Sequence, residues 1–199
     1  MKYKLTDVKI NFMGKTLFQI EAVKCFGDIV KGQKGGFIEK ESNLSQFCNA
    51  WVYGDAKVSG DAEVYGDAEV YGNAWVSGNA EVYGDAKVYG NAKVYGDAEV
   101  YGNAEVYGDA KVYGNAKVYG DAEVYGNADY LVIGPIGSRN DITTFFKTAN
   151  NDIKVSCGCF TGNIEEFLEK VNETHGNNNY AKEYKTAVEI AKIHIFGGE

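Results

Sequence analysis

The chain has 199 residues, a net charge of −8 and a single proline. This acidic balance disfavours non-specific binding to nucleic acid, whose phosphates attract cationic surfaces. No apolar stretch approaches the length of a membrane span, and the start Met1-Lys-Tyr-Lys has no signal-peptide core, so we expect neither a membrane protein nor an exported one. The four cysteines do not form a secreted-type disulfide framework, which favours the cytoplasm of a bacterial host cell.

The first 49 residues predict a β-structured cap. Residues 2–24 read as a β-hairpin, with two strand-like runs on either side of a turn at Met13-Gly14-Lys15. A glycine-rich stretch follows at 27–49 and leads into imperfect hexads. An open end of a solenoid exposes unpaired backbone groups, so residues 1–49 are expected to cover it.

Residues 50–130 are a strict repeat. Fourteen alanines stand six residues apart, from Ala50 to Ala128, in copies of A-x-V-Y-G-D/N. Alternation puts Ala and Val on one face of a short strand and the residue between them on the other. Gly followed by Asp or Asn marks a corner. Three such units make one coil of about eighteen residues, and successive coils stack at the strand spacing of about 4.8 Å.

This pattern resembles the hexapeptide-repeat left-handed β-helix family, and left-handedness is implied by that resemblance. The stretch GGFIEKESNLSQFCNAWVYGDA, Gly35 to Ala56, resembles the opening of a narrower group of bacterial and phage proteins that run on into YG-N/D-A repeats. The tail, with GSR, TTFF and CGCFTG, looks like one that follows such repeats in phage proteins. The resemblance implies architecture and a phage or prophage setting, and it supplies no reaction.

Residues 131–199 predict a small C-terminal ββαα domain. Ile142–Thr148 and Ile153–Phe160 read as strands. Asn163 and Glu166 form a capping box for a first helix, and a second helix begins at about Tyr180. The expected fold is therefore mainly β: a hairpin cap, a single-stranded left-handed β-helix and the ββαα domain.

Acyl transfer is the activity for which hexapeptide β-helices are best known, and such enzymes use a histidine as general base. The repeat has no histidine, and both histidines of the chain, His175 and His194, lie in the tail. Without a base near the prism we expect a protein that is not an enzyme, with an acyltransferase kept as an alternative.

The three faces of the prism differ in charge. The third face is positive, and Ser59 and Ser77 replace tyrosines beside Trp75. Complementary faces favour a homo-oligomer, with a trimer preferred, although ordinary solvated ladders explain the pattern equally well. The residues assigned to a surface or interface are Lys57, Trp75, Lys93, Tyr95 and Lys111. The stretch from Ala50 to Asp129 has 14 acidic residues against 5 lysines, so its negative charge could also imitate DNA.

The tail holds the only arginine of the chain, Arg139. Its fork geometry suits bidentate contact with phosphate or carboxylate, and a glycine-led helix start offers free N–H donors. The candidate ligand-binding residues are Ser138, Arg139, Thr143, Thr144, Lys147, Thr161 and Gly162. An arginine that caps the last coil is the structural alternative. Cys157, Cys159 and His175 lack a fourth zinc ligand, so neither a metal nor another cofactor is expected.

Together these features favour a non-enzymatic, oligomeric, phage-type binding protein. The β-helix is the scaffold, and the tail binds a small anionic, nucleotide-like ligand, with sequestration of a host defence signal as the role that the resemblance implies. The alternative is an inhibitor that binds a host defence or nucleic-acid-binding protein through the acidic tyrosine ladders. Neither direct nucleic-acid binding nor membrane binding is expected.

Overall fold

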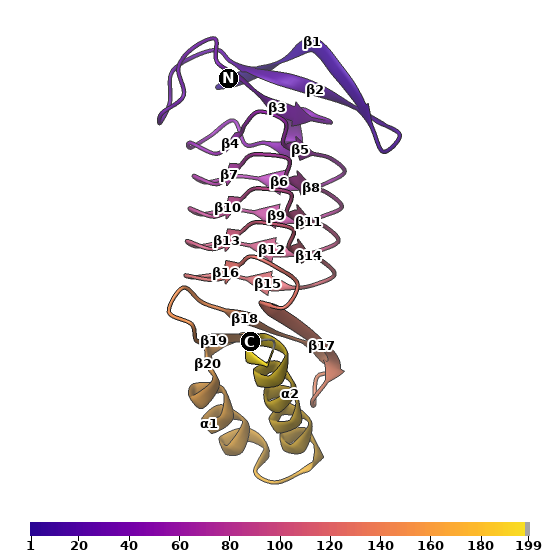
Figure 1. Cartoon of the computed structure of the whole chain (residues 1–199), viewed down its shortest axis with the longest axis vertical. Helices are drawn as coiled ribbons and strands as arrows, with labels where there is room; N and C mark the ends of the chain where they lie inside the picture. The colour runs from indigo at the N-terminus through magenta and orange to yellow at the C-terminus, as the bar shows by residue number, and fades with distance from the viewer. Residues whose placement is uncertain (198–199) are drawn as a thin grey trace.

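A computed structural model describes residues 1–197 as three parts stacked along one long axis (Figure 1). A β-sheet cap lies at the N-terminal end, a parallel β-solenoid follows, and a sheet with two helices closes the other end. The last two residues of the expected domain 131–199 lie outside the described residues. No helix within residues 1–197 is long and apolar enough to cross a membrane.

The solenoid consists of two-residue strands that pair in parallel with a residue 18 positions away, as Val88 does with Val70 and Val106. They form three ladders, β4-β7-β10-β13-β16, β6-β9-β12-β15 and β5-β8-β11-β14. The strands are β4 (Trp51–Val52), β5 (Lys57–Val58), β6 (Glu63–Val64), β7 (Glu69–Val70), β8 (Trp75–Val76), β9 (Glu81–Val82), β10 (Lys87–Val88), β11 (Lys93–Val94), β12 (Glu99–Val100), β13 (Glu105–Val106), β14 (Lys111–Val112), β15 (Lys117–Val118) and β16 (Glu123–Val124).

The predicted solenoid register is confirmed. Every repeat alanine from Ala50 to Ala122 and every repeat valine from Val52 to Val124 is fully buried. The corner glycines adopt left-handed backbone conformations, for example Gly60 at φ +73°, where an added Cβ would lie 2.9 Å from the carbonyl oxygen of Gly78. The coils therefore stack too closely at the corners for a side chain. The fourteenth alanine, Ala128, is exposed because the chain leaves the repeat there.

The N-terminal cap extends one ladder of the solenoid. Strands β1 (Tyr3–Phe12) and β2 (Lys15–Ala22) form the expected hairpin, and β3 (Lys34–Ile38) pairs antiparallel with β2 and parallel with β5. One sheet therefore runs from the hairpin down the third face. A short 3-10 helix, η1 (Glu41–Asn43), follows β3.

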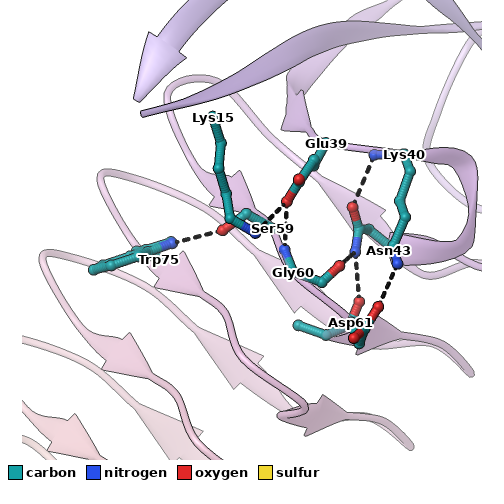
Figure 2. Close-up of polar contacts among 9 residues, drawn as sticks. Lys15, Glu39, Lys40, Asn43, Ser59, Gly60, Asp61 and Trp75 are labelled. Carbon is teal, nitrogen blue, oxygen red and sulfur yellow. Dashed lines mark hydrogen bonds and ion pairs between the residues drawn. The ribbon is translucent and has the colours of Figure 1, made fainter. Parts of the chain in front are cut away.

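Polar contacts fasten this cap to the first coil (Figure 2). The Glu39 carboxylate accepts hydrogen bonds from the Lys15 ammonium at 2.7 Å and from the backbone N–H of Gly60 at 2.6 Å. The buried Asn43 amide donates to the carbonyl oxygens of Gly60 at 3.0 Å and Ala62 at 2.8 Å. These bonds satisfy backbone groups that the open end of a solenoid would leave unpaired.

Trp51, at an outward position of the repeat, is not exposed to solvent. Its side chain is fully buried, because Tyr3 and Phe26 of the cap pack edge-on against its ring at centroid distances of 6.1 and 5.4 Å. The repeat pattern predicts which side chains lie inside the coil, but it does not predict that the cap covers this outward position.

The C-terminal part contains four strands rather than the two expected. The antiparallel sheet has the order β17-β18-β19-β20 and is followed by two helices. Its elements are β17 (Tyr130–Ile136), β18 (Asp141–Lys147), β19 (Ile153–Cys157), β20 (Phe160–Asn163), α1 (Ile164–His175) and α2 (Asn179–Phe196). The predicted central strands, both helices and the capping box of Asn163 and Glu166 are present, whereas β17 and β20 were missed.

The two faces of this sheet have different partners. Phe146 belongs to the solenoid core, whereas its neighbour Phe145 packs into a second core with the helices. The sheet thus closes the open end of the prism on one side and carries α1 and α2 on the other (Figure 1).

Candidate functional site

A cavity of about 320 Å³ lies on the helix-bearing side of the C-terminal sheet. The β17–β18 turn, the β19–β20 turn and both helices surround it, and no solenoid residue lines it. Its lining residues are Ser138, Arg139, Asp141, Cys157, Gly158, Cys159, Phe160, Phe167, Lys170, Val171, Thr174, His175 and Tyr184. We call this cavity the tail pocket.

Arg139 lines this pocket together with residues of the C-terminal part alone, a position that does not favour the alternative role of capping the last coil. Its Nη1 atom lies 3.0 Å from the place that a Cβ on Gly158 would occupy. The guanidinium therefore packs over a glycine whose missing side chain leaves it room. Within residues 1–197 Arg139 makes no ion pair with a carboxylate, so its charge is not neutralised by a direct partner.

Aromatic side chains form the apolar wall of the tail pocket. Phe167 packs against Phe160 at 5.3 Å and against Tyr184 at 5.5 Å between ring centroids, and His175 lies 5.9 Å from Tyr184. The wall is fixed by close packing, because a Cβ on Gly137 would lie only 1.9 Å from the Tyr184 hydroxyl oxygen. A rigid apolar wall beside two cations, Arg139 and Lys170, suits a ligand with an apolar body and an anionic group.

Tyr184 remains protonated at neutral pH. Burial, together with the nearby Cys157 thiol and Glu183 carboxylate, raises its pKa to about 12, although the Arg139 guanidinium acts in the opposite direction. Its hydroxyl therefore stays a hydrogen-bond donor. Cys157 also accepts a hydrogen bond from the Thr143 hydroxyl at 3.3 Å.

The sulfur and nitrogen ligands considered for zinc do meet at this pocket. Cys157, Cys159 and His175 all line it. Among residues 1–197, however, no three histidine, cysteine or acidic side chains are placed to hold a metal ion together.

Two of the seven predicted ligand residues, Ser138 and Arg139, line the tail pocket, and Thr143 adjoins it through Cys157. The other four do not line it. Thr144 accepts a hydrogen bond from the backbone N–H of Lys117, because alternate residues of β18 face opposite sides of the sheet. Lys147 ends β18 beside Tyr125 and Asp129.

Thr161 and Gly162 lie on β20 instead of at the pocket. Thr161 is exposed, and a Cβ on Gly162 would meet the Glu166 carboxylate at 2.5 Å. That carboxylate already accepts a hydrogen bond from the backbone N–H of Asn163, so the helix start has its own acidic partner. The anion-binding role proposed for this segment is therefore not supported by its surroundings.

Sequence reasoning did not assign Lys170, Thr174, His175, Tyr184 or Asp141 to a ligand pocket, although it considered His175 as a zinc ligand. The first three lie on one side of α1 within about one and a half turns, which is a recognisable signal. Only the packing of the helices on the sheet reveals that this side meets Arg139.

The predicted interface residues divide into two groups. Phe12, at the tip of the β1–β2 hairpin, packs edge-on against Trp75 at 5.2 Å, and the Lys57 ammonium lies over the Phe12 ring at 5.1 Å. Figure 2 shows the Trp75 indole nitrogen directed at Ser59, to which it donates at 3.2 Å. This part of the third face is covered by the chain itself. Lys93, Tyr95 and Lys111 lie beyond the hairpin.

The expectation that no histidine lies near the prism was wrong. His194 on α2 places its Nε2 atom 3.2 Å from the carbonyl oxygen of Asn127, at the last corner of the repeat. The tail folds back so that a residue 67 positions later in the chain reaches the solenoid.

Comparison with known proteins gives no family to set beside this geometry. No family model matches the chain, and no curated protein matches it.

Proposed function

We propose that this chain is a non-enzymatic binding protein in which the β-solenoid is a rigid scaffold and the tail pocket holds a small anionic ligand. The observation that carries the proposal is the meeting of Arg139 and Lys170 beside a packed aromatic wall. The chain as a whole has a net charge of −8, so two cations against one carboxylate, Asp141, make this pocket locally unusual.

The chemistry of the pocket selects the ligand class. Arg139 offers two parallel N–H donors to a phosphate or carboxylate, and Tyr184 offers a neutral hydroxyl. Phe160, Phe167 and Val171 supply apolar contact for a ring or an aliphatic body. A nucleotide-like compound satisfies both requirements, and the phage-type role of sequestering a host defence signal in the bacterial cytoplasm is part of the same proposal.

The rival proposal, an inhibitor that binds a protein partner through the acidic tyrosine ladders, has less support. The ladder groups bond to one another: the Tyr65 hydroxyl donates to Glu81 at 2.7 Å, and the Tyr89 hydroxyl donates to Glu105 at 2.8 Å. The Glu99 carboxylate pairs with Lys117 at 2.8 Å. Carboxylates that already pair with side chains of their own chain gain less from a cationic protein partner.

Two measurements test the proposal. Small molecules released by heating the purified protein are identified by mass spectrometry, and the released compound is then titrated calorimetrically into the wild type and Arg139→Lys. Loss of one bidentate, charge-assisted contact should weaken binding about tenfold or more. Thermal unfolding should be unchanged, because Arg139 is exposed and makes no ion pair within residues 1–197.

Lys147→Gln is the matched control. It removes a cation from the same sheet at a position outside the tail pocket, so ligand affinity should stay at the wild-type value. Lys170→Gln, inside the pocket, should weaken binding. If Arg139→Lys loses binding and stability in parallel, Arg139 has a structural role and the proposal fails.

A further inference from the structure

A second cavity lies where the third face of the solenoid meets the tail, and it is independent of the tail pocket. Its volume is about 450 Å³, within the range of roughly 300–1,000 Å³ that small-molecule sites occupy. Tyr95, Lys111 and Tyr113 bound it on the solenoid side, and Tyr130, Leu131 and His194 are among the tail residues that bound it on the other. We call it the junction cavity.

Tyrosine rings on the solenoid stack on one another at a regular distance. Tyr65 and Tyr83 lie 4.8 Å apart and nearly parallel, and Tyr71 and Tyr89 lie 4.7 Å apart. The repeat thus builds columns of parallel rings whose spacing is that of the strands.

One of the three columns is closed by an aromatic ring of the C-terminal sheet, because Phe146 packs edge-on against Tyr119 at 4.9 Å. A second column ends in Tyr125, which packs edge-on against Tyr107 at 5.3 Å and lies beside Glu123 and Asp129. The third column is shorter, with Tyr95 stacked on Tyr113 at 5.4 Å. Within residues 1–197 no aromatic ring packs on Tyr113 beyond Tyr95, and 51% of Tyr113 is exposed beside the junction cavity.

Lys111, which lines the junction cavity, is paired in its ladder with a second lysine. Lys93 and Lys111 occupy neighbouring positions in the parallel ladder, and neither forms an ion pair within residues 1–197. Like charges in adjacent strands repel one another, and an anion between them relieves the repulsion. No acidic residue lines the junction cavity, although the repeat around it is strongly acidic.

The backbone of Lys111 is held by side chains on the tail side of the cavity. The Lys111 N–H donates to the side chain of Asn127 at 3.1 Å, and its carbonyl oxygen accepts a hydrogen bond from the Tyr130 hydroxyl. His194 contacts the carbonyl oxygen of the same Asn127. The Lys111 backbone, Asn127 and His194 are therefore linked to one another, and a wall fixed in advance lowers the entropic cost of binding.

From these observations we propose that the junction cavity binds a planar aromatic compound that carries an anionic group and is about the size of a nucleoside monophosphate. Its ring continues the tyrosine column by stacking on Tyr113, and its anionic group lies toward Lys111 and Lys93. Stacking on an aromatic side chain and charge pairing are separate contributions, so a ligand needs both parts to bind well.

Calorimetric titration with adenosine monophosphate tests this inference, with adenosine and ribose 5-phosphate as half-ligands. The full compound should bind more tightly than either half. Tyr113→Ala should weaken its binding about tenfold or more, since one stacked base accounts for a difference of that size. Tyr113→Phe retains the ring and should bind like the wild type. Lys111→Gln should weaken adenosine monophosphate but not adenosine.

Tyr125→Ala is the matched control, because Tyr125 is also exposed at the end of a column, at 63%, but has Glu123 and Asp129 beside it. It should bind like the wild type. Arg139→Lys separates the two sites: if it alone abolishes binding, the compound occupies the tail pocket and the junction site is refuted. Absence of binding to the wild type, or equal binding by wild type and Tyr113→Ala, also refutes it. So does a Tyr113→Ala variant that changes the mass of the assembly, which would make Tyr113 a contact between copies.

Discussion

Lys2 is a buried cation at the start of the solenoid. Its ammonium donates hydrogen bonds to the carbonyl oxygens of Ala50 at 2.7 Å, Phe47 at 3.3 Å and Cys48 at 3.4 Å, and it lies 5.0 Å from the centre of the Phe26 ring. Only 1% of Lys2 is exposed. Burial lowers its pKa from 10.5 to about 8, and the charges of Cys48 and Asp67 oppose that shift without cancelling it. The Lys2 ammonium thus supplies hydrogen-bond donors to carbonyl groups of residues 47–50 that would otherwise be unpaired.

This lowered pKa predicts a rise of stability with pH. Between pH 8 and 10.5 the unfolded chain keeps the Lys2 proton while the folded chain releases it, so the free energy of unfolding increases over that window. The increase should approach about 1.4 kcal/mol per pH unit. Urea unfolding at pH 7.5 to 9.5 measures it. Lys2→Met should lack this rise whatever its absolute stability, and equal slopes in both proteins would contradict the assignment.

The tyrosine columns of the solenoid are stable only while their hydroxyl groups are protonated. Burial, with a smaller contribution from the carboxylate of Glu99, raises the pKa of Tyr83 from 10 to about 12. Burial and the hydrogen bond to Glu81 also raise the pKa of Tyr65. Each ionised tyrosine would place a negative charge among carboxylates in a stacked column, which the folded state disfavours.

We therefore expect the solenoid to lose stability above pH 10. The unfolded tyrosines ionise near pH 10 while the folded ones remain protonated, so the stabilisation is complete below pH 10 and is lost as the pH rises toward 12. Tyr83→Phe removes one ionisable hydroxyl and should reduce the slope by up to about 1.4 kcal/mol per pH unit. Circular dichroism with denaturant between pH 9.5 and 11.5 measures the slopes, and an unchanged slope in Tyr83→Phe would contradict the prediction.

The packed interior of the coils is a second feature on which the stability of the solenoid depends. Val88 is fully buried between Val70 and Val106 of the adjacent coils. Val88→Asp introduces a charge that has no partner in the core and should destabilise the protein by more than about 4 kcal/mol. Lys87→Gln, at the adjacent outward position, should change stability by less than about 1 kcal/mol. Thermal unfolding compares the two, and a Val88→Asp protein as stable as the wild type would overturn the register.

At the scale of the whole molecule, a homo-oligomer remains our prediction, with a trimer preferred. The hairpin already covers Lys57 and Trp75, so a contact between copies must involve other surfaces. Helix α2 exposes Ile193 at 71% and Ile190 at 46%, which makes it a candidate for such a contact. Light scattering should give a mass of about three times the 21.7 kDa of one chain, and Ile193→Lys should lower it. A monomer mass for the wild type at micromolar concentration would rule the oligomer out.

The sequence by itself determined the solenoid, the hairpin before it, and the two central strands and both helices after it. Alternation of Ala and Val at a six-residue period places both inside whatever coil is formed, because the pattern is local and each coil repeats its neighbour. The turn at Met13 and Gly14 and the capping box at Asn163 were also readable, since both depend on residues within three positions of one another. Arg139 stood out as the single arginine, and the structure places it at a pocket.

Only the tertiary structure decided what surrounds these residues. Trp51 is buried because Tyr3 and Phe26 of the cap reach it across the chain. Thr144 faces the solenoid because the C-terminal sheet closes the end of the prism, and the same placement brings His194 to Asn127. Each of these contacts joins segments at least 25 residues apart. The hydrophobic pattern of one segment specifies that a face is buried, but which distant segment covers it depends on how the three parts of the chain stack.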